Sequence, residues 1–129
     1  MVHVGIGYDV HQLVAGRKLI LGALGEDDIG HFFPNTDPRW KGVPSKIFLE
    51  EAARQVLQRN GRIVNVDATV IAQAPKIYPH IAAMKACIAD ALGVREAQIG
   101  IKATTNEHMG FIGREEGIAA MAVASVELP

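Results

Sequence analysis

The middle of the sequence alternates between helical and strand-like patterns, and this alternation restricts the possible folds. Apolar residues recur at helical spacing from Ser45 to about Asn60, and Arg62 to Ala74 is rich in β-branched residues. A second amphipathic helix is predicted from His80 to Leu92, and Gln98 to Thr104 alternates as a strand does. This order predicts a single α/β or α+β domain, a sandwich of helices on a sheet, over residues 1–129.

The two predicted helices have recognisable ends and apolar faces. Ser45 can cap the first helix, Gly61 can stop it, and Gly93 follows the second helix. The core-facing positions expected in the first helix are Ile47, Leu49, Ala52, Ala53 and Val56. Cys87, the single cysteine, lies in the apolar pattern of the second helix. We therefore expect a small buried side chain there rather than a nucleophile, and no disulfide.

The flanking segments are less regular. Val2 to Tyr8 alternates as a strand, and Lys18 to Gly22 is a second, short strand candidate. Ala23 to Gly42 is rich in Gly, Asp, Pro and Asn and is expected to be irregular, and Gly110 to Gly117 is expected to be a loop. Gly117 to Leu128 fits either a helix, because of its alanines, or one long strand.

Composition and charge exclude several classes of protein. With 13 basic and 14 acidic residues and no basic run, nothing indicates nucleic-acid binding. No stretch is long enough to span a membrane, the start does not resemble a signal peptide, and the lone cysteine fits a cytoplasmic protein. Hydrophobic residues make up 49% of the chain and the mean hydropathy is +0.15, so some apolar surface is expected between subunits.

Asp9 and His11 are the first candidate metal ligands. Side chains two residues apart on a strand point to the same face, and a carboxylate with an imidazole suits Zn²⁺. Two ligands are too few for a catalytic zinc, which usually takes three from the protein. A surface ion pair or a buried, hydrogen-bonded histidine is an equally open interpretation.

Polar clusters follow the later predicted strands. Ala72 to Lys76 comes directly after a strand, where Lys76 could bind a phosphate or nucleotide or simply be solvated. Lys102 to Glu107 offers hydroxyl, amide and carboxylate groups that could bind phosphate and a divalent cation, or could form a polar turn. Gly110 to Gly117 contains Arg114, a natural phosphate ligand. Asp28 to Asp37 is either a binding loop or ordinary turns.

The order of these motifs is more informative than any one of them. Along the chain stand GYDVH, LILG, DIGHFFPNTDPRWKG, NVDATVIAQAPK and IKATTNEHMGFIGREEGIAA. This series closely resembles the 2-C-methyl-D-erythritol 2,4-cyclodiphosphate synthase family over nearly the whole chain.

The resemblance implies a cytoplasmic homotrimer with active sites between subunits, one Zn²⁺ per subunit and a second cation, Mg²⁺ or Mn²⁺. It implies that Asp9 and His11 bind zinc, that Glu107 binds the second metal, and that Thr105 lies near the transition state. Substrate contacts are implied for Asp28, Gly30, Phe33, Pro34, Asn35, Thr36, Asp37, Ala72, Gln73, Ala74, Pro75, Lys76, Ile77, Tyr78, Thr104, Phe111 and Arg114. Ala72 to Tyr78 would bind the cytidine.

The implied reaction is that of a phosphorus–oxygen lyase in the non-mevalonate isoprenoid pathway. It converts 4-diphosphocytidyl-2-C-methyl-D-erythritol 2-phosphate to the cyclic diphosphate and CMP. The substrate's own 2-phosphate is the nucleophile, so no general base is needed. Positioning within one molecule can supply on the order of 7–11 kcal/mol of the barrier, and two cations would neutralise phosphate charge.

The chain departs from the family pattern at three places. Asn35 stands where the family usually has Asp, and Asn106 where Thr is common. Between Gly22 and Ala23 the family has a loop with a His-Ser pair and a helix bearing the third metal histidine, and this sequence has neither. We predict on the order of 30 further residues at this junction in the natural polypeptide, enough for a loop and one helix. The alternative is a non-catalytic nucleotide- or isoprenoid-binding trimer without an intact metal site.

Overall fold

The computed structural model describes residues 1–11 and 45–129. Its elements in chain order are β1 (Val2–His11), α3 (Ser45–Gln58), β2 (Arg62–Ile71), α4 (Ile81–Leu92), β3 (Ile99–Thr104), α5 (Gly110–Gly113) and β4 (Ile118–Glu127). Short helical turns at Tyr78–His80 and Glu96–Gln98 precede α4 and β3. The predicted strand Lys18 to Gly22, the irregular segment Ala23 to Gly42 and the Gly22–Ala23 junction lie outside the described residues.

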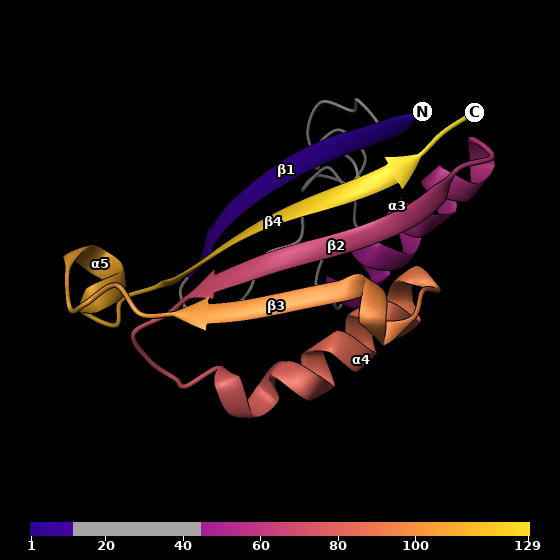
Figure 1. Cartoon of the computed structure of the whole chain (residues 1–129). Coiled ribbons are helices and arrows are strands. Elements are labelled where there is room, and N and C mark those ends of the chain that lie inside the picture. The colour runs from indigo at the N-terminus through magenta and orange to yellow at the C-terminus, as the bar shows by residue number, and fades with distance from the viewer. Residues whose placement is uncertain (12–44) are drawn as a thin grey trace, which may run out of the picture.

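The described strands form one sheet in the order β1-β4-β2-β3 (Figure 1). Strand β4 pairs antiparallel with both β1 and β2, and β2 pairs parallel with β3. The parallel pair is joined by a crossover through α4, as parallel neighbours require. The expectation of helices on a sheet is therefore confirmed for the part of the chain that is described.

Strand β4 resolves the ambiguity of the alanine-rich C-terminal segment. It is hydrogen-bonded to β1 on one side and to β2 on the other along nearly its whole length. Pairing on both edges outweighs the helix propensity of its alanines, because propensity is a weak preference that tertiary context overrides. The expected loop at Gly110 to Gly117 is corrected in part, since Gly110–Gly113 forms one helical turn, α5.

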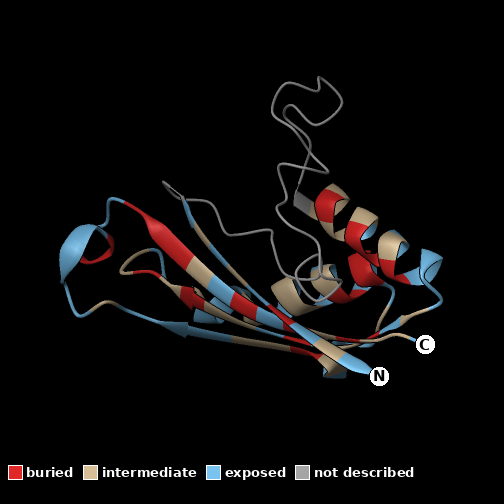
Figure 2. Ribbon diagram, turned by 90° about the horizontal axis from the view of Figure 1, so that it is seen from above, coloured by how far each residue is buried: buried red, intermediate tan, exposed pale blue. Residues whose placement is uncertain are grey.

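Helices α3 and α4 cover one face of the sheet, and the main core lies between these layers (Figure 2). The buried residues of this core are Phe48, Ala52, Ala53, Val56, Ile63, Val66, Ala89, Leu92, Ile99, Ala124 and Val126. Ala52, Ala53 and Val56 were expected there, but Phe48 is the aromatic residue that α3 buries, whereas Ile47 and Leu49 are only half-buried. Phe48 lies four residues before Ala52 and eight before Val56, on one helical face.

Cys87 is exposed, contrary to the expectation of a buried side chain. Helix α4 buries Ala89 and Leu92 against the sheet. Ala89 is two residues from Cys87, which corresponds to about 200° around a helix of 3.6 residues per turn. The apolar composition of α4 concealed which side faces the core, because alanines occur on both sides.

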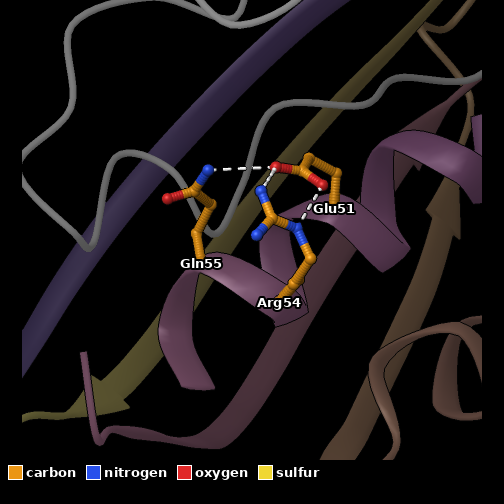
Figure 3. A network of polar contacts seen from close by, with 3 residues as sticks. All are labelled: Glu51, Arg54 and Gln55. Atoms are coloured by element: carbon orange, nitrogen blue, oxygen red, sulfur yellow. Dashed lines mark hydrogen bonds and ion pairs between the residues drawn. The ribbon is translucent and has the colours of Figure 1, made fainter. Parts of the chain in front are cut away.

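Several charged side chains of α3 are paired. Glu51 accepts hydrogen bonds from Arg54 Nε at 2.7 Å and Gln55 Nε2 at 3.0 Å (Figure 3). The bond from Arg54 is the main reason why the pKa of Glu51 lies below its usual range. Lys46 Nζ donates to Asp90 Oδ2 at 2.5 Å and so connects α3 to α4. This bond lowers the pKa of the Asp90 carboxyl and raises that of the Lys46 ammonium.

The opposite face of the sheet, which we call the open face, exposes a row of apolar side chains. In β1 these are Val2, Val4, Ile6, Tyr8 and Val10, and in β4 they are Met121 and Val123. Ile6 is 66% exposed although its register partner, Val123, is also apolar. Toward β2 and β3 the open face becomes polar, with Asp67 paired to Lys102. An apolar row of this length on one face indicates a contact surface.

Among the described helices, none combines the length and apolar character that crossing a bilayer would demand.

Candidate functional site

The strand register gathers the predicted site residues at one end of the sheet. His11 pairs with Ile118, Ala119 pairs with Ile71, and Ile71 pairs with Thr104. The ends of β1, β2 and β3 therefore lie beside the start of β4. The segments that follow β2 and β3 leave from this end, where α5 projects beyond the strands (Figure 1).

The segment Ala72 to Tyr78, expected to bind cytidine, is anchored at its start and exposed farther along. The Ala72 N–H donates to the Thr104 carbonyl at 2.9 Å, which extends the β2–β3 pairing. Ala72 is buried, and Ile77 packs on a small apolar cluster that also contains Val70 and Ile118. Lys76 and Tyr78 are exposed, so this anchored segment presents a cation and an aromatic ring to a ligand.

The end of β3 and the tight turn that follows it present two hydroxyls and a carboxylate. Thr104, Thr105 and Glu107 are all exposed. The Glu107 N–H donates to Thr105 Oγ1 at 3.3 Å, and Asn106 Nδ2 donates to the Met109 carbonyl at 2.8 Å. Glu107 and His108 have φ angles of 53° and 60°, a left-handed conformation that is costly for residues other than glycine. We call Thr105 to Met109 the phosphate turn, after the diphosphate contacts that the family resemblance implies for this part of the chain.

Two contacts hold this turn from outside. Gln73 Oε1 accepts a hydrogen bond from the His108 N–H at 3.0 Å. Gly113 of α5 lies so close that a Cβ built on it would be 2.1 Å from the His108 carbonyl carbon. The sequence analysis did not predict this close contact of Gly113 with His108. The glycines of the GFIGREEG motif, which include Gly113, nevertheless indicate that two backbone segments can approach closely here.

Phe111 lies on α5 and Arg114 at its end, so both follow the phosphate turn closely in the chain. Phe111 is 40% exposed. Arg114 Nε donates to Glu116 Oε1 at 3.0 Å, and this bond raises the pKa of Arg114 and lowers that of Glu116. Both side chains are exposed, and the guanidinium remains a cation at any physiological pH.

Asp9 and His11 lie two residues apart at the end of β1. Their register partners, Ala120 and Ile118, lie on the helix-covered side of the sheet. Asp9 is half-buried, and the Val10 N–H donates to its Oδ1 at 3.0 Å. A carboxylate and an imidazole fit zinc, yet the described residues contain no group of three or more His, Cys, Asp or Glu able to hold a metal ion.

The remaining predicted contacts, Asp28, Gly30 and Phe33 to Asp37, lie outside the described residues.

Within the described part, the site divides into two groups at opposite edges of the sheet, because β1 and β3 are the outer strands. Three strand spacings of about 4.8 Å separate these edges by roughly 14 Å.

Comparison with known proteins identifies the family. The sequence profile of the YgbB family matches residues 20–127. A "2-C-methyl-D-erythritol 2,4-cyclodiphosphate synthase" of Thiobacillus denitrificans is 45% identical over 155 residues, covering 98% of this chain and 97% of that protein. A "Bifunctional enzyme IspD/IspF" of Mesorhizobium japonicum is 54% identical over 157 residues, covering 99% of this chain but 39% of that protein. This chain thus spans about two fifths of the length of the bifunctional relatives it matches.

A solved structure agrees with the sequence relatives. The "IspF (Plasmodium falciparum) CDP complex" superposes with a TM-score of 0.82 at 30% identity, and the match covers 98% of this chain and 96% of that one. Fold, sequence and the order of motifs therefore agree. The chain belongs to the YgbB family, that of the 2-C-methyl-D-erythritol 2,4-cyclodiphosphate synthases of isoprenoid biosynthesis.

Proposed function

We propose that this protein converts 4-diphosphocytidyl-2-C-methyl-D-erythritol 2-phosphate to 2-C-methyl-D-erythritol 2,4-cyclodiphosphate and CMP. The observation that carries the proposal is that the Ala72 to Tyr78 segment is hydrogen-bonded both to the end of β3 and to the phosphate turn, at one end of the sheet. A segment fit for a nucleotide thereby lies beside hydroxyls and a carboxylate fit for phosphates and a cation. The reaction needs these two features side by side.

In the proposed reaction, an oxygen of the substrate's 2-phosphate attacks the β-phosphorus. The bond from the β-phosphorus to the oxygen shared with the α-phosphate breaks, and CMP leaves with that oxygen. The chain's part is to hold both ends of the substrate so that attack occurs in line with the departing CMP. Exposed Lys76 would hold the nucleotide, and the hydroxyls of Thr104 and Thr105 would donate to phosphate oxygens as charge shifts.

Divalent cations fit the residues present. Asp9 and His11 have the donor atoms that zinc prefers, and the exposed carboxylate of Glu107 suits Mg²⁺ or Mn²⁺. When bound, such cations would polarise the phosphates and neutralise the leaving group. The Plasmodium falciparum structure is a complex with CDP, which supports the nucleotide part of the proposal.

We propose a cytoplasmic homotrimer with active sites between subunits. The apolar open face, with Ile6 66% and Val4 63% exposed, needs a partner surface. A second reason to propose active sites between subunits is that the width of the sheet separates Asp9 from Glu107 within one subunit. Metals that act on one diphosphate lie about 3.5–4 Å apart in two-metal sites, so strand β1 of one subunit would have to meet strand β3 of its neighbour.

The third zinc ligand belongs, in this proposal, to residues between Gly22 and Ala23 of the natural polypeptide. Alignments with two relatives run over 157 and 155 positions, whereas the chain has 129 residues. These relatives therefore have residues without a counterpart here. The family match begins at residue 20, although Asp9 and His11 precede it, which favours a discontinuity near this point.

The competing function is a nucleotide- or isoprenoid-binding trimer that has lost its metal site. Zinc content separates the two. About one tightly bound zinc per subunit, measured by atomic absorption after dialysis, supports the enzyme. A metal-free trimer that still binds CMP supports the binding protein and rejects the enzyme.

A further inference from the structure

The hydrogen bond between Gln73 and His108 joins the two halves of the proposed site. These residues are 35 positions apart in the chain, and each lies in a different half. Gln73 belongs to the segment that would bind the nucleoside, and His108 follows Glu107, which would hold the second cation. A change in one half can therefore be transmitted to the other through one side chain.

The phosphate turn is the kind of structure that such a contact can control. Two consecutive residues, Glu107 and His108, hold left-handed backbone angles that the surroundings must enforce. Asn106 Nδ2 fixes the far side of the turn through the Met109 carbonyl, and Gly113 supports the back of His108. Gln73 Oε1 holds the His108 N–H, so it fixes the peptide directly after Glu107.

The position of Gln73 depends on the Ala72 to Tyr78 segment to which it belongs. Its neighbour Ala72 is buried and hydrogen-bonded to the Thr104 carbonyl, whereas Gln73 is only half-buried and Pro75 and Lys76 beyond it are exposed. A nucleoside that orders the exposed part of the segment would reduce the freedom of the Gln73 side chain. The Glu107 carboxylate would then be held in position at less entropic cost, which is a route to positive coupling between sites.

We propose that Gln73 is a positioning residue that couples nucleoside binding to divalent-cation binding at Glu107. This inference rests on the proposed function for the location of both ligands. Thermodynamic linkage requires the coupling to be reciprocal, so cytidine should tighten Mn²⁺ binding by the factor by which Mn²⁺ tightens cytidine binding. Cytidine is the right probe because it has no phosphate and cannot itself bridge to the metal.

The experiment measures the Mn²⁺ affinity of the full chain by EPR of free Mn²⁺, with and without saturating cytidine. Zinc is added beforehand at one equivalent per subunit. In the unmodified protein we expect cytidine to tighten Mn²⁺ binding about fivefold, at the lower end of common coupling factors. Gln73→Met keeps the length of the side chain but loses the acceptor. In this variant the ratio of the Mn²⁺ affinities with and without cytidine should fall to about one.

Two variants complete the test. Gln73→Glu keeps an acceptor oxygen and should retain the ratio, because its added charge acts on Mn²⁺ binding with and without cytidine and cancels. Gln98→Met is the matched control. Gln98 Nε2 donates to the Val64 carbonyl at 2.9 Å at the other end of the sheet, so its loss should weaken the fold without altering the ratio.

The outcomes separate this inference from the proposed function. An unchanged ratio in Gln73→Met, a lost ratio in Gln98→Met, or no effect of cytidine on Mn²⁺ in the unmodified protein would each overturn the coupling role. Glu107→Gln tests the metal assignment independently. If it binds Mn²⁺ as the unmodified protein does, or if cytidine does not bind at all, the proposed location of the ligands is wrong and the inference falls with it.

Discussion

Replacing Gly113 by Ala should damage the proposed site while leaving the core intact. A Cβ at this position would lie 2.1 Å from the His108 carbonyl carbon and 2.7 Å from its Cα and carbonyl oxygen. Carbon atoms in favourable contact are about 3.5–4.0 Å apart, so α5 and the phosphate turn must separate by more than about 1 Å. The neighbouring atoms are backbone, and no side-chain rotation can relieve the overlap.

The expected loss follows from that displacement. A misplacement of about 1 Å at a catalytic site can cost about 100-fold in rate, which corresponds to roughly 2.7 kcal/mol of transition-state stabilisation. We therefore predict that Gly113→Ala lowers kcat/KM for cyclisation about 100-fold and weakens Mn²⁺ binding, because Glu107 moves with His108. The assay is release of CMP from the diphosphocytidyl substrate, followed by chromatography.

Gly93→Ala is the control for this prediction. Gly93 ends α4 with a φ of 69°, and a Cβ there would meet nothing within 4 Å. The variant should lose stability, on the order of 1 kcal/mol, because alanine is strained in the left-handed region, yet it should keep kcat/KM within about twofold. If Gly113→Ala retains the activity and Mn²⁺ affinity of the unmodified protein, or if Gly93→Ala loses as much activity, the reasoning about the phosphate turn is refuted.

Three further predictions test other parts of the account. Lys76→Ala should weaken CMP binding about tenfold in calorimetry without changing zinc content, and an unchanged CMP affinity would count against the nucleotide assignment. Ile6→Asp on the open face should convert trimers to monomers in sedimentation, whereas Leu57→Asp, at an exposed position of α3, should not; a trimeric Ile6→Asp would remove the open face from the interface. Asp90 has a pKa lowered by its bond to Lys46, so its stabilising effect is complete above the ordinary carboxyl pKa and is lost as pH falls through the lowered value. The difference in urea midpoint between the unmodified protein and Asp90→Asn should therefore shrink on going from pH 7 to pH 2, and a constant difference would contradict this.

Much of the fold could be predicted from sequence because the signals were local. The β-branched run of β2 and the Gly93 stop of α4 gave the correct elements, and the left-handed φ of Gly93 explains the stop. The N-terminal strand was also correct but runs to His11 rather than ending at Tyr8. This extension places Asp9 and His11 in one strand.

Other features depend on contacts that no local pattern specifies. The C-terminal segment is a strand because β1 and β2 lie on either side of it, and alanine alone favours the opposite assignment. Phe48 was missing from the expected core and Cys87 was misplaced for a similar reason, since packing decides which side of a helix faces the sheet. At the site, the residues that would meet a ligand were predicted from motifs, whereas the support from Gln73 and Gly113 depends on two segments that are distant in sequence.

The central claim is tested most directly by turnover of the diphosphocytidyl substrate with the zinc content measured on the same sample. Phosphorus NMR in the presence of Mg²⁺ should show one CMP and one cyclic diphosphate for each substrate consumed, with about one zinc per subunit. Removal of zinc by a chelator should abolish the reaction, and addition of zinc should restore it. A trimer that binds CMP, holds no zinc and leaves the substrate intact would contradict the claim and establish the binding protein instead.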